Sequence, residues 1–165
     1  MNSKYEINTK ENREFLKASC EELLNFGHRF PSPNGGSYYL GDDGTPWKDR
    51  NRETWITCRM AHVYSLGLML GHEGSGELAD AALKGLKGEL HDEKNGGWYA
   101  GVTPEGGIVP NKQCYAHAFV ILAAASALTA GRSGAKELLE EALAVYDRHF
   151  WNEEEGLEYR IYCAG

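Results

Sequence analysis

Apolar residues recur at helical spacing in five stretches of the chain, and glycine ends most of these stretches. Residues 112–131 are apolar for nearly their whole length and end at Gly131, which is typical of a helix C-terminus. The stretch approaches the length of a membrane span, about 18 residues, but its many alanines favour close packing between helices. A helix that is hydrophobic on every side is normally surrounded by other helices. We therefore predict that residues 112–131 form a buried helix of a soluble protein.

The other four stretches complete a helical framework. Residues 9–26, 75–90 and 133–150 have one apolar and one polar face, and residues 49–70 are apolar over much of their length. Residues 28–48 are rich in proline and glycine, which predicts an ordered loop with a short hairpin around residues 42–44. Residues 98–102 and 108–109 predict a second β-hairpin, placed between two helices.

The second half of this pattern repeats the first half at a constant offset of about 60 residues. Gly71, Leu78, Ala82, Leu83, Leu90, Gly96 and Tyr99 recur as Gly131, Leu138, Ala142, Leu143, Phe150, Gly156 and Tyr159. Upstream, Ala61-His62 corresponds to Ala116-His117 if a gap of a few residues is allowed. Each unit pairs a buried helix with an amphipathic one, which is the pattern of an inner and an outer ring. Two units cannot close a ring, so we expect an incomplete assembly.

Composition and charge restrict the partners of this protein. Hydrophobic residues make up 42% and charged residues 25% of the chain, which are globular values. The formal net charge of −7 argues against binding to nucleic acid or to an anionic membrane. The four cysteines are scattered and no signal peptide precedes Lys10, so we expect reduced thiols in the cytoplasm.

Arg59 is the first candidate for a binding residue, because it lies in the middle of an apolar helical stretch. A charge at such a position is costly unless it is paired or faces a cavity. Its guanidinium could bind hydroxyl groups or stabilise an oxyanion. The alternatives are an ion pair with Glu53 or Asp49, or an exposed helix face.

The entrance of the buried helix holds two more candidates. Tyr115 could donate a hydrogen bond to a sugar hydroxyl, and His117 could act as a general base or be a hydrogen-bonded core residue. Because His62 corresponds to His117 in the repeat, a shared structural role is favoured. Cys58 with His62 and Cys114 with His117 have irregular spacings, so no metal site is predicted. Four aromatic residues could stack on a sugar ring or pack in the core: Trp47, Trp55, Trp98 and Tyr99.

Four segments together resemble the N-acylglucosamine 2-epimerase superfamily. They are WITCRMAHVYSLG at residues 55–67, GGWY at 96–99, KQCYAHAFVILAAA at 112–125, and ALAVYDRHFW at 142–151 with the EEEG turn that follows. This superfamily contains N-acylglucosamine 2-epimerases, mannose and sulfoquinovose aldose–ketose isomerases, and cellobiose 2-epimerases. The resemblance covers almost the whole chain after the first helix.

The resemblance implies an all-α fold, an (α/α)6 toroid, of which residues 1–165 would be the N-terminal portion of a single domain. It implies an isomerase or epimerase that needs no cofactor and moves a proton between C1 and C2 of an open-chain sugar, or removes and returns one at C2. The substrate would be a monosaccharide or disaccharide. By motif, Arg59 matches the substrate-binding arginine and Tyr115 a pocket tyrosine, with Trp55 nearby. The family's catalytic histidines lie in later helices, beyond Gly165, so these 165 residues alone are expected to be inactive.

Two other functions stay open at the level of the sequence. One is a non-catalytic helical-repeat module that binds protein or glycan. The other is a glycosidase or lyase on an α/α toroid, which would need paired carboxylates in the site, and none is convincingly placed. Because the ring is incomplete, we expect Val120, Leu122, Leu128 and the apolar face of residues 133–150 to be partly uncovered. Such a surface predicts a homo-oligomer or an aggregated chain.

Overall fold

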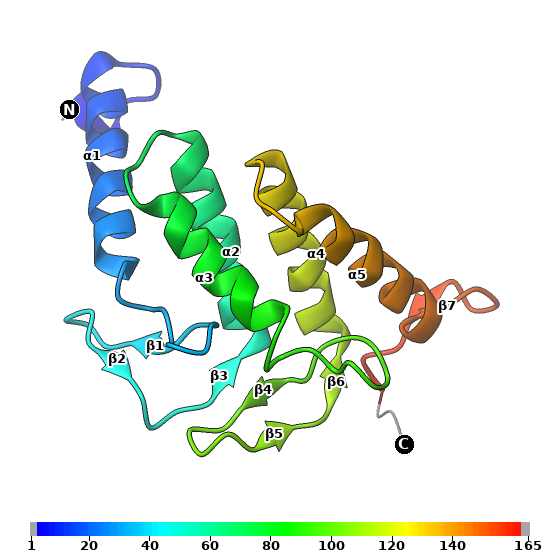
Figure 1. Ribbon diagram of the computed structural model, residues 1–165. Coiled ribbons are helices and arrows are strands. Elements are labelled where there is room, and N and C mark those ends of the chain that lie inside the picture. The colour runs from blue at the N-terminus through cyan, green and yellow to red at the C-terminus, as the bar shows by residue number, and fades with distance from the viewer. Residues whose placement is uncertain (1–2, 163–165) are drawn as a thin grey trace.

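The computed structural model describes residues 3–162 and consists of helices joined by loops that carry very short strands (Figure 1). The helices are η1 Ser3–Tyr5, α1 Lys10–Gly27, α2 Thr54–Met69, α3 Ser75–Leu86, α4 Cys114–Thr129 and α5 Ala135–His149. The strands are β1 Tyr39–Leu40, β2 Pro46–Trp47, β3 Arg52–Glu53, β4 Gly101–Val102, β5 Ile108–Val109, β6 Lys112–Gln113, β7 Trp151–Asn152, β8 Leu157–Glu158 and β9 Ile161–Tyr162. Cys163 lies outside the described residues.

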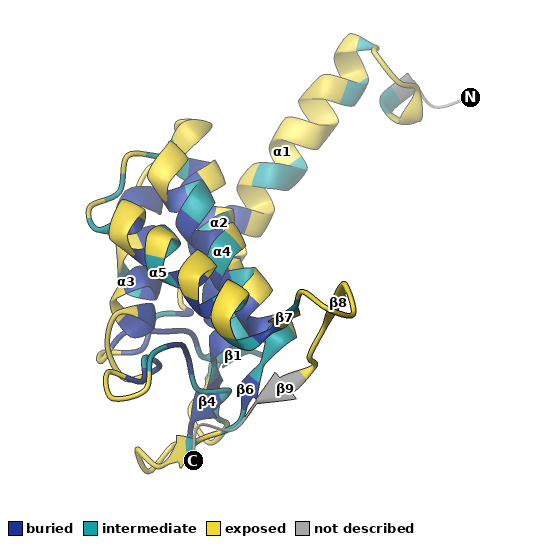
Figure 2. Cartoon of the chain, turned by 90° about the vertical axis from the view of Figure 1, so that its right-hand side faces the viewer, coloured by how far each residue is buried: buried dark blue, intermediate teal, exposed yellow. Residues whose placement is uncertain are grey.

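Two helical hairpins form the body of the molecule. Helices α2 and α4 pack side by side in one layer, and α3 and α5 cover them in a second layer (Figures 1 and 2). Each hairpin turns through two glycines with positive φ, which an L side chain rarely adopts. These are Gly71 and Gly74 in the first hairpin and Gly131 and Gly134 in the second. The predicted alternation of an apolar and an amphipathic helix is therefore the alternation of the two layers. The prediction that residues 112–131 form a helix buried on every side is wrong, because Tyr115, Leu122 and Leu128 are exposed on the face of α4 that none of the described helices covers.

Helix α1 stands apart from this body (Figure 2). Thr9 caps it by accepting a hydrogen bond from the backbone N–H of Asn12 at 3.1 Å, as is typical of threonine before a helix. Its buried residues are Leu24 and Gly27, at the end that meets α2, where the hydroxyl of Tyr64 donates to the carbonyl of Leu24. The apolar face that the sequence predicts for this helix is therefore mostly exposed.

The short strands gather at the end of the body where α2 and α4 begin (Figure 1). Strands β3, β4 and β5 form one antiparallel sheet, β6 pairs with β9, and β1–β2 and β7–β8 are hairpins. The prediction that residues 49–53 and 112–113 are helical is wrong, because the residues just before each helix pair with a neighbouring strand instead. The first backbone N–H of α2 and of α4 is hydrogen-bonded to the residue just before the paired strand. Thr54 donates to the carbonyl of Ala100 before β4, and Cys114 donates to that of Arg160 before β9, both at 3.0 Å.

The core lies between the two layers of helices (Figure 2). Its largest fully buried side chains include Trp98, Tyr64, Phe30 and Phe150. The expectation that Val120 is uncovered is wrong, because Val120 belongs to this core, whereas Leu122 and Leu128 are exposed as expected. On α5 the residues Leu138 and Val145 are buried and Leu143 is exposed, so its apolar face is only partly uncovered. Across the described residues, no helix combines the length and hydrophobicity that crossing a membrane requires.

Candidate functional site

Trp55, Arg59 and Tyr115 come together where α2 and α4 begin. A guanidinium nitrogen of Arg59, Nη2, donates to the hydroxyl of Tyr115 over 3.1 Å. The guanidinium carbon lies 4.7 Å from the ring centre of Trp55, and the rings of Trp55 and Tyr115 are 6.0 Å apart. Two adjacent helices of one layer therefore contribute to a single cluster, which unites all three candidate binding residues that the sequence singled out.

The repeat explains why these side chains meet. Trp55 and Tyr115 are each the second residue of their helix, and Arg59 follows Trp55 by one turn on the same face. In the second repeat the place of Arg59 is held by Phe119, whose ring centre lies 5.0 Å from the guanidinium. The guanidinium thus contacts aromatic rings from both helices, which is a favourable cation–π arrangement.

Arg59 and Tyr115 are both exposed, on the opposite face of the helices from the core. Within residues 3–162, no ion pair joins Arg59 to Glu53 or Asp49, so of the two alternatives left open by the sequence the exposed helix face is the one that the structure shows. The partner of its Nη2 is a neutral phenol, and a guanidinium carries five N–H donors. Donors therefore remain for the oxygens of a bound molecule.

Glu53 adjoins the cluster and was not singled out from the sequence as a member of the site. Its Oε2 accepts the indole N–H of Trp55 over 2.7 Å and also accepts the hydroxyl of Tyr39. Burial and the contact with Glu53 raise the pKa of Tyr39 well above its ordinary value. Tyr39 and Glu53 also line a polar hollow of about 340 Å³ together with residues 49–51.

His117 does not belong to this cluster and is a structural residue. It is fully buried, its Nδ1 donates to the carbonyl of Gln113 over 2.8 Å, and its Nε2 accepts the backbone N–H of Trp98 over 3.1 Å. Burial lowers its pKa to about 4, so the ring is neutral at pH 7. Both ring nitrogens are engaged by the backbone, which leaves neither of them for proton transfer to a ligand.

The correspondence that the sequence indicates between His62 and His117 is wrong. The structure repeats at a constant offset of 60 from Thr54 to Cys114 (114 − 54), without a gap, so Thr57 holds the place of His117. Thr57 also has the same role, because its hydroxyl accepts the backbone N–H of Ser37 over 3.0 Å. His62 instead links the two helices of its layer through Ser126 Oγ at 2.6 Å.

The remaining candidates are structural or peripheral. Trp98 is fully buried and donates its indole N–H to the carbonyl of Leu86, while the ring of Trp47 lies beneath Arg50. Burial raises the thiol pKa of Cys58 well above its ordinary value. Burial, and then Glu158, raise that of Cys114 to about 11. Among the residues that the structure describes, no three potential ligands gather around a possible metal position.

A buried ion pair, also missed in the sequence, fixes the loop that leads to Trp98. Lys112 Nζ lies 2.7 Å from Asp92 Oδ2, and both side chains are almost completely enclosed. The carboxylate of Asp92 also accepts from the backbone N–H of Lys94 and Asn95. Burial alone would raise the pKa of Asp92, but the hydrogen bonds from Lys112 and Asn95 hold it well below its ordinary value. This pair anchors β6, which leads directly into Tyr115.

Comparison with known proteins finds one matching family model and several similar proteins. The family model of N-acylglucosamine 2-epimerase (GlcNAc 2-epimerase) matches residues 35–160. A D-mannose isomerase from Thermobifida fusca is 41% identical over 145 residues, which cover 87% of this chain and 36% of that protein. This chain therefore spans about a third of the length of that relative.

Solved structures share the fold. A crystal structure of D-mannose isomerase matches with a TM-score of 0.81 at 24% identity, covering 92% of this chain and 40% of that one. The cellobiose 2-epimerase of Bacillus thermoamylovorans B4167 matches with a TM-score of 0.80 at 23% identity, covering 92% and 41%. The predicted all-α fold, an incomplete (α/α)6 toroid with a short β-hairpin in an inter-helix loop, is thereby confirmed.

Proposed function

The chain belongs to the N-acylglucosamine 2-epimerase family, and we propose that its Trp55–Arg59–Tyr115 cluster binds the substrate of a sugar isomerase or 2-epimerase. The guanidinium of Arg59 and the hydroxyl of Tyr115 hold oxygen atoms of an open-chain sugar. The ring of Trp55 lies against its C–H groups. The cluster is one wall of the substrate site.

This proposal rests on one observation: the guanidinium of Arg59 is held between side chains of α2 and α4. Arg59 contacts the rings of Trp55 and Phe119 and donates to Tyr115 at 3.1 Å, so it is held in one orientation before a ligand arrives. Isomerisation and 2-epimerisation through an enediol develop negative charge on a sugar oxygen. A preorganised cation beside that oxygen stabilises the charge more than solvent does, because little reorganisation is needed.

The names of the relatives favour mannose as the proposed substrate. The Thermobifida fusca relative and one of the solved structures both bear the name D-mannose isomerase. We therefore propose an aldose–ketose isomerase of the mannose type in preference to a 2-epimerase. The protein would act in the cytoplasm without a cofactor.

The acid and base that move the proton are proposed to lie outside residues 1–165. His117 is neutral, enclosed and engaged at both ring nitrogens, and His62 is bonded to Ser126. The curated relative is almost three times as long as the matched region, which leaves room for further inner helices. Residues 1–165 would then be the N-terminal portion of a single toroidal domain, which binds a sugar but does not convert it.

Sugar binding by the 165-residue chain tests the proposal. Saturation-transfer NMR is performed with mannose, N-acetylglucosamine and cellobiose on the wild-type chain and on Arg59→Gln, Tyr115→Phe and Arg132→Gln. We expect mannose to give the strongest signal. Arg59→Gln should weaken binding at least about tenfold, because a charged hydrogen bond is lost, and Tyr115→Phe about twofold to tenfold.

Arg132→Gln is the matched control, because Arg132 pairs with Asp80 in the outer layer, away from the cluster. It should leave mannose binding unchanged. Equal binding by wild-type and Arg59→Gln chains would contradict the assignment of the cluster. Conversion of mannose to fructose by the 165-residue chain would contradict the location proposed for the acid and base.

A further inference from the structure

Glu53 occupies a junction between the loop region and the candidate site. Its backbone belongs to β3, where it pairs with Gly101 of β4, and it directly precedes the first residue of α2. A Cβ atom at Gly101 would lie 2.8 Å from the carbonyl oxygen of Arg52, so these two strands approach more closely than a side chain would permit. The side chain of Glu53 therefore starts from a firmly held backbone.

One oxygen of Glu53 joins two elements. Oε2 accepts the indole N–H of Trp55, from the first turn of α2, and the hydroxyl of Tyr39, from the β1–β2 hairpin. The rings of Tyr39 and Trp55 meet edge to face, with centres 6.4 Å apart and planes at 70°. The indole is thus fixed by a hydrogen bond at its nitrogen and by a neighbouring ring.

The orientation of this indole matters because the guanidinium of Arg59 lies over its face. The guanidinium carbon is 4.7 Å from the indole centre, and cation–π attraction requires the cation to be above the ring rather than at its edge. Rotation of the indole about its side-chain torsions would withdraw that face from Arg59. A hydrogen bond that fixes the indole nitrogen therefore also fixes the position of the cation.

The second repeat supports a specific link between the carboxylate and an indole. Gln113 holds the place of Glu53, and the residue two positions later is Tyr115, which has no ring N–H. The carboxylate of Glu53 is therefore present in the first repeat, where the indole N–H of Trp55 needs an acceptor, and absent from the second repeat, where there is no indole. Both helices lack a side-chain cap at this residue, so capping does not explain the difference.

We propose that Glu53 is a positioning residue of the sugar site, which orients Trp55, and through it Arg59, by accepting the indole N–H. This inference rests on the proposed function, since it concerns the same site. Glu53 acts on the ligand only through these two side chains. Its carboxylate couples the β1–β2 hairpin to the site, because Tyr39 shares the same oxygen.

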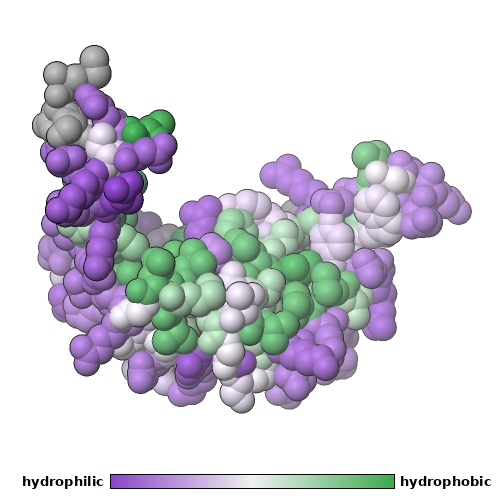
Figure 3. All heavy atoms as spheres, turned by 90° about the horizontal axis from the view of Figure 1, so that it is seen from above, coloured by the Kyte–Doolittle hydropathy of each residue, from purple (hydrophilic) through white to green (hydrophobic). Residues whose placement is uncertain are grey.

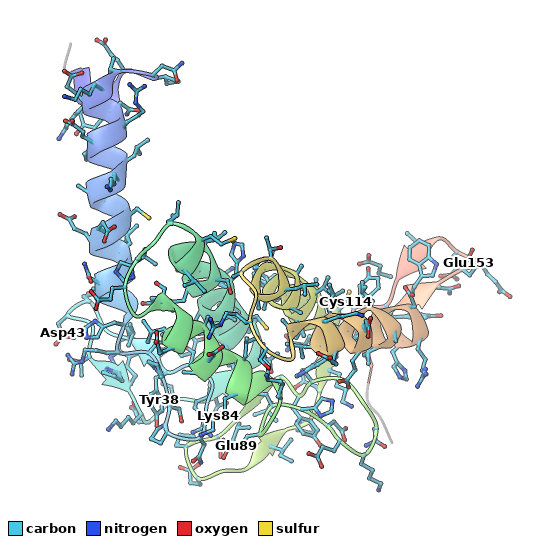
Figure 4. All side chains as sticks on the ribbon, turned by 45° about the horizontal axis from the view of Figure 1, so that its top comes forward. Tyr38, Asp43, Lys84, Glu89, Cys114 and Glu153 are labelled. Atoms are coloured by element: carbon cyan, nitrogen blue, oxygen red, sulfur yellow. The ribbon has the colours of Figure 1, made fainter. Side chains whose placement is uncertain are left out.

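The chain offers a matched control for this hydrogen bond. Trp151 donates its indole N–H to Glu153 Oε2 over 2.6 Å, in the exposed β7–β8 turn. Figure 4 shows Glu153 at the opposite end of the molecule from Tyr38, the neighbour of Tyr39. The same chemical contact is thus present once beside the cluster and once far from it.

The test follows the four indole N–H signals of the 165-residue chain by ¹⁵N–¹H NMR, with Trp55 assigned from Trp55→Phe and mannose affinity measured in parallel. We expect Glu53→Ala to move the Trp55 signal, to speed its exchange with solvent, and to weaken mannose binding about tenfold. Glu53→Gln, whose amide oxygen still accepts, should recover most of that affinity. Glu153→Gln should move the Trp151 signal and leave mannose affinity unchanged. Unmoved signals of Trp98 and Trp151 in Glu53→Ala would show that the chain remains folded, whereas Trp47 pairs with Tyr39 in the β1–β2 hairpin and is not used as a control.

Two outcomes separate this inference from the proposed function. If the Trp55 signal and the mannose affinity are both unmoved in Glu53→Ala, the positioning role is wrong. The role is also wrong if Glu53→Gln is as impaired as Glu53→Ala, because then the acceptor is not what matters. If the wild-type chain binds no sugar while Glu53→Ala still displaces the Trp55 signal, the proposed function fails and the control of the indole by Glu53 is supported.

Discussion

At the scale of single residues, His117 shows how burial decides the chemistry of a side chain. Its imidazole is fully buried, donates through Nδ1 and accepts through Nε2, so only the neutral form satisfies both backbone partners. Protonation would place a second ring N–H against the N–H of Trp98. Thr57 provides the same acceptor in the first repeat, which identifies the shared requirement as one acceptor at this position.

The depressed pKa of His117 predicts that acid destabilises the fold. The folded pKa is about 4, below the ordinary value of 6.5, so the unfolded chain binds this proton first as pH falls. The stabilising contribution is therefore complete above pH 6.5 and is lost between pH 6.5 and 4, at about 1 kcal/mol per pH unit. Urea denaturation followed by circular dichroism at several pH values measures this slope.

His117→Thr tests the origin of that pH dependence. We expect this variant to lose about 2–4 kcal/mol of stability at pH 7, from the vacated volume and weaker hydrogen bonding, and to show a shallower slope below pH 6.5. His28→Thr, which alters an exposed histidine at the end of α1, should retain the wild-type slope. A slope that persists unchanged in His117→Thr would assign the pH dependence to other groups.

The residues of the candidate site differ in how far the sequence could reveal them. Trp55 and Arg59 are one helical turn apart, and Tyr115 lies in the corresponding place of the next repeat, so pattern and resemblance were sufficient to select them. Tyr39 and Glu53 meet across a loop, as do Asp92 and Lys112. Those contacts depend on how the loops fold back on the helices, and local periodicity carries no information about that.

At the scale of elements, α3 and the loop before β1 interlock through glycine. A Cβ atom at Gly85 would lie 2.3 Å from the backbone nitrogen of Gly36, and one at Gly35 would lie 2.5 Å from the nitrogen of Gly85. Gly35 also has a φ of +95°, which favours glycine. Helix propensity alone marks Gly85 as a weak point of α3, but the packing shows why no larger residue fits.

Gly85→Ala is therefore expected to destabilise the protein, despite the higher helix propensity of alanine. The added methyl group meets rigid backbone, so we expect a loss of about 2 kcal/mol or more. Gly76→Ala, in the same helix, meets only the flexible end of Arg132 at 3.3 Å and should change stability by at most about 1 kcal/mol. Thermal unfolding of the two variants makes the comparison, and equal stabilities would refute the interlock.

The elements themselves were largely predictable, and their starting points were not. Five helices, the hairpins within residues 28–48 and 98–109, and the repeat offset agree with the sequence pattern. The predicted starts of α2 and α4 were too early, because strands of two residues leave no detectable alternation. The alignment of His62 with His117 required a gap because the pair Ala-His occurs at different positions along α2 and α4.

At the scale of the whole molecule, one face carries many exposed apolar side chains. They include Val63, Leu66, Met69 and Leu70 on or just after α2, and Leu122 and Leu128 on α4. Figure 3 shows hydrophobic residues concentrated across the middle of the surface seen from above. The apolar residues named on α2 and α4 belong to the layer of helices that would line the inside of a closed toroid. Soluble monomers rarely expose contiguous apolar patches above about 300–600 Å².

We therefore expect the 165-residue chain to associate with itself. Size-exclusion chromatography with light scattering should give a mass above that of a monomer, rising with concentration. The double substitution Leu66→Gln and Leu122→Gln should shift the distribution toward monomer, because it removes two apolar contacts from the exposed layer. Ile108→Gln, which alters an exposed residue in the β4–β5 hairpin, is the control and should have no such effect. A monomer at all concentrations in the wild-type chain would contradict the expectation.

The hydrogen bonds that close each loop also bear on the order of events during synthesis on a ribosome. The backbone N–H of Ser37 donates to Thr57, that of Trp98 donates to His117, and that of Cys114 donates to the carbonyl of Arg160. Every one of these partners emerges later than the segment that it fixes. A nascent chain can thus form a helix as soon as it leaves the exit tunnel, yet each loop becomes rigid only after the next segment has been translated.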